Sequence, residues 1–233
     1  NKNHRYAKTG KDFKINRLCD KRPVGNRVEQ GLVVSVITPF NDAYSQYNQS
    51  RCTLESIEEC GGIVIKLSDI ESLETELRIY LKTEKYISRK NDENQEIKRI
   101  LRDRKEDNRI RKSRLLEFTK EMLVNAEYYV AGQKRDMGAE PLTALSEACD
   151  YLIDNTFTKM GYIEKSYTDL QREVQAVLRA DNMVLNLPEF NLKAIEEARE
   201  YVELCTSTSK QIVMQELVCN RFANRPYGWM EWD

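Results

Sequence analysis

Basic side chains at helical spacing are the residues of this sequence whose types and positions best suit a chemical task. Four of them recur at steps of three or four and share one face of a predicted helix: Arg102, Lys105, Arg109 and Lys112. The segment Lys98–Arg114 carries nine Lys or Arg against three Asp or Glu, a local excess of six. A basic helix face binds phosphate groups with an affinity that falls as salt rises. The alternative is a solvated helix whose arginines pair with Asp103 or Glu106.

Aromatic residues near the end of the sequence form a second candidate site, with Phe222 upstream of them: Tyr227, Trp229 and Trp232. Each aromatic ring buries a large apolar area when it packs, so a free tail of this composition is unfavourable. We expect this segment to be an interface, and the alternative is that it covers a core. We interpret residues 206–233 as the truncated start of a winged-helix-like domain, with a helix that begins after Ser209.

Catalytic constellations are missing from the sequence. Gly10-Lys11 is followed by aspartate, and residue 5 is arginine where a phosphate-binding loop needs its first glycine. The only histidine is His4, and the six cysteines form no paired zinc-ligand spacing. We expect reduced cysteines that pack as small hydrophobic residues. The sequence therefore predicts no catalytic, cofactor-binding or metal-binding residue and no enzyme activity for this chain.

Composition limits the partners. The 233 residues carry a net charge of −1, with 40% hydrophobic and 32% charged residues, so any electrostatic partner must recognise a local patch. No apolar run reaches the length of roughly 18 residues that a membrane helix needs, and no signal peptide is visible. We expect a cytoplasmic protein. The chain begins at Asn1 without methionine, and we interpret it as a piece of a longer protein.

A long helix with an apolar stripe is the strongest structural signal. Residues 93–132 contain no proline and no glycine before Gly132, and apolar residues recur at steps of three or four at both ends. The stripe is interrupted between Leu101 and Leu115, so a break near Asp107 is the alternative. Residues 70–87 show a similar stripe, and the short connection at Asn91-Asp92 predicts an antiparallel helical hairpin.

The rest of the chain predicts further helices and two strands. Residues 32–38 and 63–67 are rich in β-branched residues and predict strands, whereas residues 1–30 resemble a polar tail or surface loop. Further helices are predicted from four segments: residues 141–157, 168–179, 191–204 and 209–222. Glu196, Glu197 and Glu200 are interpreted as a solvated helix face.

We predict a mainly α (α+β) fold that combines a long helical hairpin, a helical bundle and a small two-strand element near the N-terminus. The predicted domains are a small α/β element at 1–69, the hairpin at 70–132, a helical bundle at 139–205 and the winged-helix-like start at 206–233. Two strands make a poor sheet alone, so we expect them to pair with strands outside this chain or with each other under a helix.

Four short motifs in this order resemble a known family: VITP at 36–39, ELRIYLKTEKYI at 76–87, NAEYYVAG at 125–132 and RPYGW at 225–229. Together they resemble the region downstream of the nucleotide-binding core in the large P-loop ATPases of BREX phage-defence systems (BrxC/PglY type). Met230 stands where that family usually has proline. The resemblance covers nearly the whole chain.

The resemblance implies a much larger parent that binds ATP and Mg²⁺ and acts in phage defence with a DNA methyltransferase and other system proteins. The motifs that would hold ATP are not in this chain, so no catalytic residue is carried over. We therefore expect a non-catalytic scaffold or interaction fragment of a phage-resistance protein. Its expected partners are other subunits of the defence complex or a second copy of the chain. The alternative is a nucleic-acid-binding module that uses the basic face of the long helix to contact DNA.

Overall fold

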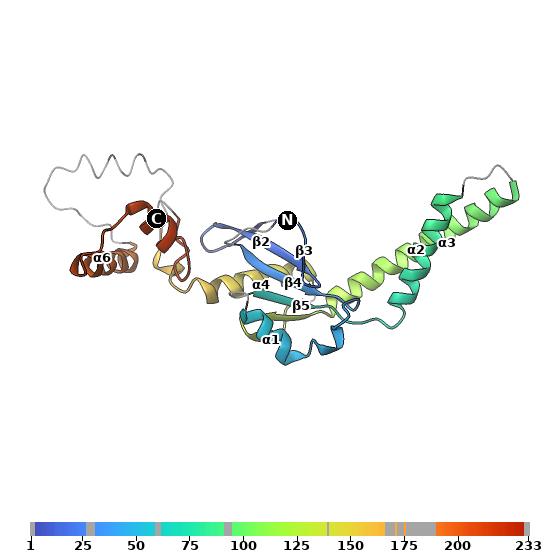
Figure 1. Cartoon of the computed structure of the whole chain (residues 1–233), viewed down its shortest axis with the longest axis horizontal. Coiled ribbons are helices and arrows are strands. Elements are labelled where there is room, and N and C mark those ends of the chain that lie inside the picture. The colour runs from blue at the N-terminus through green and yellow to red at the C-terminus, as the bar shows by residue number, and fades with distance from the viewer. Residues whose placement is uncertain are drawn as a thin grey trace. The chain divides into compact units, whose positions relative to one another are not determined.

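The computed structural model describes residues 3–26, 31–58, 62–90, 95–138, 140–165, 171, 175 and 190–230. The fold is mainly helical with α+β character, as the sequence predicts. The chain divides into two compact units (Figure 1). The first comprises residues 1–6 and 10–152, and the second comprises residues 7–9 and 153–233.

A seven-stranded sheet forms the centre of the first unit. Strands β2, β4 and β5 are parallel neighbours, and the remaining pairings are antiparallel. The short strand β3 (Arg22–Pro23) pairs only with β2. The main path of the sheet follows this order: β1 (Asn3–Arg5), β2 (Asp12–Cys19), β4 (Leu32–Ile37), β5 (Gly62–Lys66), β6 (Glu127–Val130) and β7 (Gln133–Arg135).

The two strands expected from the sequence, β4 and β5, pair with each other as the middle of this larger sheet. The expectation of a polar tail over residues 1–30 is wrong for β1, β2 and β3. Phe13 and Asn16 of the segment Asp12–Cys19 are buried, and the segment gains parallel pairing with β4. Pairing with an existing strand therefore outweighs the polar composition of this segment.

One face of the sheet is covered by α1 (Gln49–Glu58), which packs against β5 and β6. Ile37, Val64 and Tyr129 form a buried cluster with Tyr47 and Cys52. All three central residues of β5 are buried, so the strand is covered on both faces, as is usual in the parallel part of a sheet. Helix α4 (Pro141–Thr156) contacts two strands, because Asp150 bonds His4 in β1 and Tyr151 bonds Gln133 in β7.

The helical hairpin consists of α2 (Leu73–Arg89) and α3 (Gln95–Val124), which pack along each other (Figure 1). Helix α3 is continuous through Asp107, so the alternative of a break there is wrong. It ends at Val124, earlier than the sequence suggested, because Glu127–Val130 pair with β5 instead. Tyr128, Tyr129 and Val130 favour a strand, and all three are buried there.

The hairpin is inserted between two adjacent strands. The chain leaves the sheet at the end of β5, forms α2 and α3, and returns as β6, which is antiparallel to β5. Lys66 and Glu127 are register partners, so the points of departure and return lie side by side. The two strands that flank the hairpin in sequence thus pair directly with each other at its base.

The second unit begins within α4 and contains η2 (Met160–Tyr162), α6 (Leu192–Ser207), α7 (Met214–Glu216) and η3 (Leu217–Phe222). The helix predicted over 168–179 falls almost wholly outside the described residues. The helix expected to begin after Ser209 begins only at Met214, because Ser209 has a left-handed backbone (φ 54°) in the turn after α6. Asn191 occupies the N-cap position of α6, as the sequence predicts, but its side chain makes no capping hydrogen bond; its Oδ1 accepts from the N–H groups of Glu164 and Lys165 instead.

Candidate functional site

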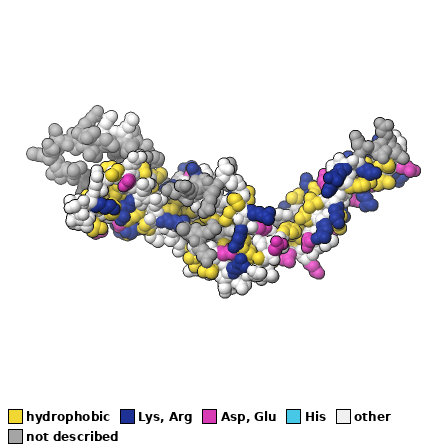
Figure 2. Space-filling view, in the orientation of Figure 1, with side chains coloured by type: hydrophobic (Ala, Val, Ile, Leu, Met, Phe, Trp, Pro, Cys, Tyr) yellow, Lys and Arg dark blue, Asp and Glu magenta, His cyan; other side chains and the backbone are white. Residues whose placement is uncertain are grey.

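The basic face of α3 is exposed, as the sequence predicts for a surface that reaches phosphates. Arg102, Lys105, Arg109 and Lys112 all have exposed side chains. Figure 2 shows Lys and Arg side chains along the hairpin, interspersed with apolar ones. The four residues differ, however, in whether they form an ion pair.

Arg109 is held by a neighbour on its own helix. Its Nε and Nη2 donate to the carboxylate of Glu106, with distances from 2.6 to 3.1 Å. These hydrogen bonds from Arg109 lower the pKa of Glu106. In contrast, Arg102, Lys105 and Lys112 take part in no ion pair among the residues that the structure describes. Three of the four predicted phosphate contacts are thus available, and the fourth is already paired, as the alternative interpretation supposed.

The side of α3 that faces α2 explains why its apolar stripe is interrupted. Asn108 is buried in the contact between α2 and α3, which we call the seam. Its Nδ2 donates to Oε2 of Glu84 on α2 at 2.8 Å. One turn further on, Arg111 donates through Nε to Oε2 of Glu76 at 3.0 Å. Arg114 reaches the other oxygen of Glu76. The middle of the hairpin is therefore packed through polar contacts rather than solvated.

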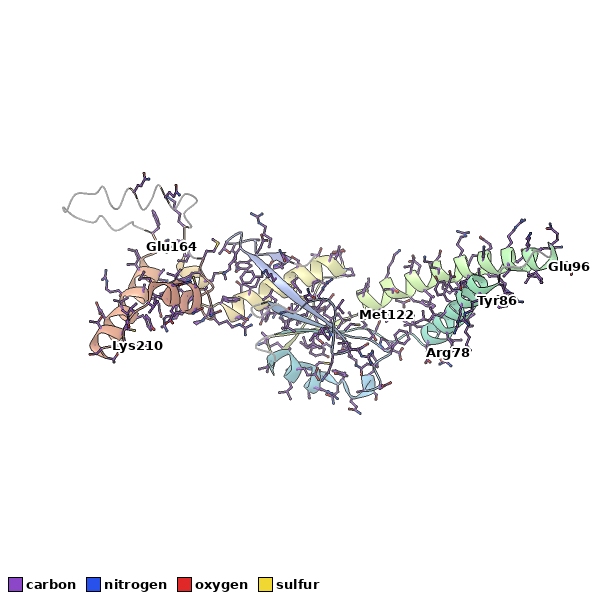
Figure 3. The ribbon with its side chains drawn as sticks, turned by 45° about the horizontal axis from the view of Figure 1, so that its top comes forward. Arg78, Tyr86, Glu96, Met122, Glu164 and Lys210 are labelled. Carbon is purple, nitrogen blue, oxygen red and sulfur yellow. The ribbon has the colours of Figure 1, made fainter. Side chains whose placement is uncertain are left out.

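The hairpin also leaves large apolar side chains in solvent. Seven of them are each more than one third exposed: Ile79, Leu81, Tyr86, Ile100, Ile110, Leu116 and Val124. Tyr86 lies on α2 beside α3, and Met122 lies at the opposite end of α3 from Glu96 (Figure 3). Ile79 and Tyr86 are seven residues apart and therefore lie on one face of α2.

The C-terminal aromatic residues lie in a core rather than on the surface. Tyr227 and Trp229 are buried, and Trp229 stacks on Phe222 with 4.7 Å between ring centroids. The indole Nε1 of Trp229 donates to the carbonyl of Lys159 at 3.0 Å. Trp232 lies outside the described residues. For Tyr227 and Trp229 the arrangement matches the alternative in which the aromatic segment covers a core.

A polar chain ties this core together, and sequence reasoning missed it. The Tyr227 hydroxyl donates to Oε1 of Glu197 at 2.6 Å, and Lys159 Nζ donates to the same oxygen at 2.6 Å. These two hydrogen bonds lower the pKa of Glu197, Lys159 contributing most. Arg221 Nη2 in turn donates to the Tyr227 hydroxyl oxygen at 3.2 Å. Glu197 is therefore no part of a solvated face; the tyrosine and lysine that reach it are distant in sequence, so helix spacing gave no sign of them.

His4, the only histidine, lies in β1 rather than in a loose tail, and its Nε2 is 2.7 Å from Oδ1 of Asp150. Among the described residues, no group of three His, Cys, Asp or Glu side chains is arranged to hold a metal ion. None of the helices in the described ranges combines the length and apolar character that crossing a membrane requires.

Comparison with known families divides the chain at a similar place to the two structural units. Residues 1–152 match the family described as the BREX ATP-binding protein BrxC 4th domain with six-stranded beta sheet. The chain belongs to the BrxC family of BREX ATP-binding proteins. Residues 159–233 match the BrxC winged helix-turn-helix domain. No solved structure gave a match.

Membership of the BrxC family agrees with the structure at two points. The main path of the sheet has six strands, from β1 to β7, the number in the family's description. The motif at 225–229 lies within the winged helix-turn-helix match and supplies Tyr227 and Trp229 to the core of the second unit. Tyr227 and Trp229, which helped to suggest the family from sequence, are thus packed structural residues.

Proposed function

We propose that this chain is a non-catalytic docking segment of a BrxC-type protein, with the α2–α3 hairpin as the surface that binds other proteins of the same BREX system. ATP and Mg²⁺ would be handled by other parts of the parent. The observation that carries the proposal is the set of seven exposed apolar side chains on a hairpin whose two helices pack mainly against each other. Apolar surface left exposed in this way is typical of a protein-binding face.

The polar seam supports this role. A docking arm must present its surface in one register, and polar pairs within a helical seam select one register over its alternatives. Asn108 with Glu84 and Arg111 with Glu76 are such pairs. They leave the outward faces of both helices available to a partner.

A sharp test removes the hairpin and keeps the sheet. Because Lys66 and Glu127 are paired, and paired strands lie roughly 5 Å apart, a short Gly/Ser turn can replace residues 69–125. We expect this variant of the parent protein to fold and to lose co-purification with the other BREX proteins. Retained co-purification would contradict the docking role.

A finer test uses point substitutions. Ile79→Ser with Tyr86→Ser should weaken partner binding without lowering the melting temperature, because both side chains are exposed. Leu142→Ser is the matched control, since Leu142 is 76% exposed on α4, outside the hairpin. Equal losses in the control and the double variant would show that the hairpin surface has no special role.

Nucleic-acid binding is the second candidate function, favoured by Arg102, Lys105 and Lys112, which make no ion pair with any described residue. It is further supported by the winged helix-turn-helix match, a class of domain that often contacts DNA. Reversal of Arg102, Lys105 and Lys112 to glutamate should abolish binding of duplex DNA and reduce its salt dependence. Arg109→Glu with Glu106→Arg preserves the local pair and is the control. Unchanged DNA affinity in the triple variant would exclude this face.

A further inference from the structure

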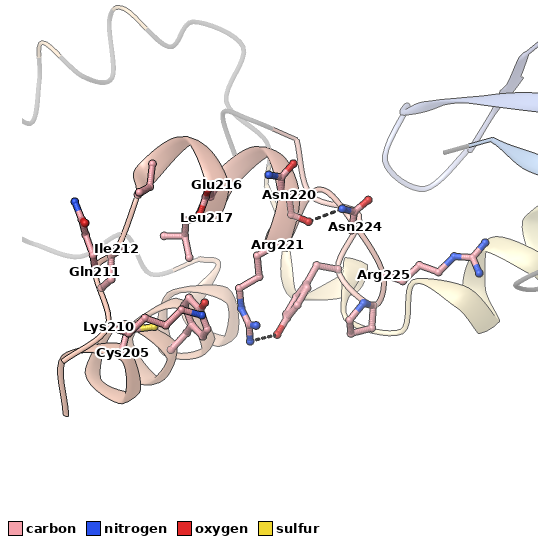
Figure 4. Close-up of a pocket in the computed structure, with 14 residues that line it drawn as sticks. Cys205, Lys210, Gln211, Ile212, Glu216, Leu217, Asn220, Arg221, Asn224 and Arg225 are labelled. Carbon is pink, nitrogen blue, oxygen red and sulfur yellow. Dashed lines mark hydrogen bonds between the residues drawn. The ribbon is translucent and has the colours of Figure 1, made fainter. Parts of the chain in front are cut away.

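The second unit contains a cavity of about 490 Å³ beside the polar chain of Tyr227 (Figure 4). It lies between the C-terminal half of α6, the turn that follows, helix η3 and the segment 224–227. Tyr201, Cys205 and Leu217 contribute to its wall, together with the amides of Asn220 and Asn224. All of its lining residues therefore lie within 159–233, the range that matches the family's winged helix-turn-helix domain.

The charges that line the cavity favour an anion. Lys210 and Arg221 line it, and Glu216 is its only lining carboxylate among the described residues. Arg225 also lines the wall, but its side chain extends away from Arg221 in Figure 4. The cavity thus has an excess of positive charge in a chain whose net charge is −1.

Arg221 makes no ion pair with a carboxylate in the described part of the chain, and other contacts hold it in place. Its guanidinium carbon lies 3.7 Å from the ring centroid of Tyr201, and its Nη2 donates to the Tyr227 hydroxyl oxygen. Its Nε is buried with no hydrogen-bond partner among the described residues. Glu197 is linked to Arg221 through Tyr227, whose hydroxyl donates to the Glu197 carboxylate. Stacking and one neutral hydrogen bond fix the guanidinium, and no carboxylate among the described residues pairs directly with its charge.

The geometry points to this cavity as a binding site for a phosphate group, with Arg221 as the anchor and Lys210 as a second positive charge. A planar, preorganised guanidinium matches the oxygens of a phosphate and makes strong charge-assisted hydrogen bonds. Asn220, whose backbone carbonyl accepts from Asn224, adds an amide at the wall. The phosphate could come from a nucleic-acid backbone or from a free nucleotide. The inference concerns a different unit from the hairpin and stands apart from the docking role.

The test measures binding of three probes to the chain: inorganic phosphate and ATP without metal by calorimetry, and random-sequence duplex DNA by fluorescence anisotropy. The DNA titration uses the chain with Arg102, Lys105 and Lys112 changed to glutamate, so that the hairpin does not contribute. DNA binding without ATP binding would assign the site to a nucleic-acid backbone. ATP binding would assign it to a nucleotide, and either result supports the site.

Variants decide whether Arg221 carries the binding. Arg221→Gln should weaken it about tenfold or more, and Arg221→Lys should restore part of it, because charge returns without the planar fork. Arg199→Gln is the control, since Arg199 is an exposed arginine of α6 outside the cavity. If Arg221→Gln fails to fold, Lys210→Gln is used and should weaken binding about threefold or more. Absence of binding for all three probes, or equal affinities in the Arg221 and Arg199 variants, would overturn the proposal.

Discussion

The amide of Asn108 on α3 donates a hydrogen bond of 2.8 Å to Oε2 of Glu84 on α2. Asn108 is only 3% exposed, and its Oδ1 has no hydrogen-bond partner among the described residues. Leu101 and Leu115 lie seven residues to either side, on the same stripe of α3. A polar group at such a position selects a register and costs stability, because part of its hydrogen-bonding capacity is unused.

Substitutions at Asn108 should therefore act in opposite directions. Asn108→Leu should raise the free energy of unfolding by about 1 kcal/mol, because a buried acceptor is replaced by an apolar group. Asn108→Asp should lower it by about 2 kcal/mol, because a second carboxylate would lie beside Glu84. Thermal denaturation followed by circular dichroism measures both. Equal destabilisation by the two variants would mean that shape, rather than polarity, decides this position.

The bridge from Glu76 to Arg111 predicts a contrast between two glutamates of α2. Both side chains of the bridge are mostly buried, and Glu76 also accepts from Arg114. Glu76→Gln should cost about 1 kcal/mol of unfolding free energy. Glu74→Gln should cost less than about 0.5 kcal/mol, because Glu74 pairs with Arg78 in an exposed position. Urea denaturation of both variants gives the comparison, and similar costs would show that the bridge adds nothing.

Local sequence patterns correctly predicted the elements that form from residues close together in the chain. The apolar stripes and the short connection marked α2 and α3, and the β-branched runs marked β4 and β5. These patterns did not predict β2 and β6. Both strands depend on pairing with β4 or β5, which are distant in sequence, and the periodicity of a single segment carries no information about such a partner. Phe13 and Ile15 alternate with polar residues, which was the available sign of β2.

The candidate sites likewise divide into features that local spacing predicts and features that depend on residues distant in sequence. Helical spacing correctly placed Arg102, Lys105, Arg109 and Lys112 on an exposed face, but it could not show that Glu106 holds Arg109. The role of Arg221 depends on Tyr201 and Tyr227, which meet it only after α6 and the C-terminal segment have packed together. Such a site is visible only in three dimensions.

Glu197 should make the stability of the second unit depend on pH. Its pKa lies below the ordinary value of 4.5, chiefly because Lys159 and Tyr227 donate to its carboxylate. The resulting stabilisation is present above about pH 4.5 and is lost as the pH falls through the lowered pKa of the folded state. Urea denaturation at a series of acidic pH values should show this loss in the wild-type chain and a smaller one in Glu197→Gln. Glu196→Gln, at an exposed neighbour, should leave the pH dependence unchanged.

Gly228 should tolerate no side chain. Its backbone is left-handed (φ +67°), and an added Cβ would lie 2.6 Å from Cδ1 of Phe157 and 2.8 Å from Cε of Met160. Gly228→Ala should therefore lower the unfolding free energy by roughly 2 kcal/mol or more. Gly161→Ala is the matched control, because an added Cβ there meets no atom within 4 Å. Thermal melting of both variants tests this, and equal melting temperatures would contradict the packing described for Gly228.

The cysteines should differ widely in reactivity. Burial raises the pKa of the Cys149 thiol to about 12, and Asp150 adds to the shift, whereas Cys219 is exposed. Site-resolved mass spectrometry after brief alkylation should find Cys219 modified and Cys149 unmodified in the folded protein. Alkylation in denaturant, where both thiols are accessible, is the control. Rapid modification of Cys149 under native conditions would mean that α4 opens readily.

The insertion of the hairpin between β5 and β6 has a consequence for the order of folding. Pairing β5 with β6 joins Lys66 to Glu127, and a flexible loop of that length would make the closure entropically costly and slow. Helices α2 and α3 are consecutive in sequence and joined by a short connection, so they can pack together early in folding. Their packing brings the ends of β5 and β6 to within pairing distance. The hairpin then converts a long-range contact into a short-range one. Substitutions that destabilise the seam should therefore lower the rate at which β5 and β6 pair during folding, as well as the stability of the hairpin itself.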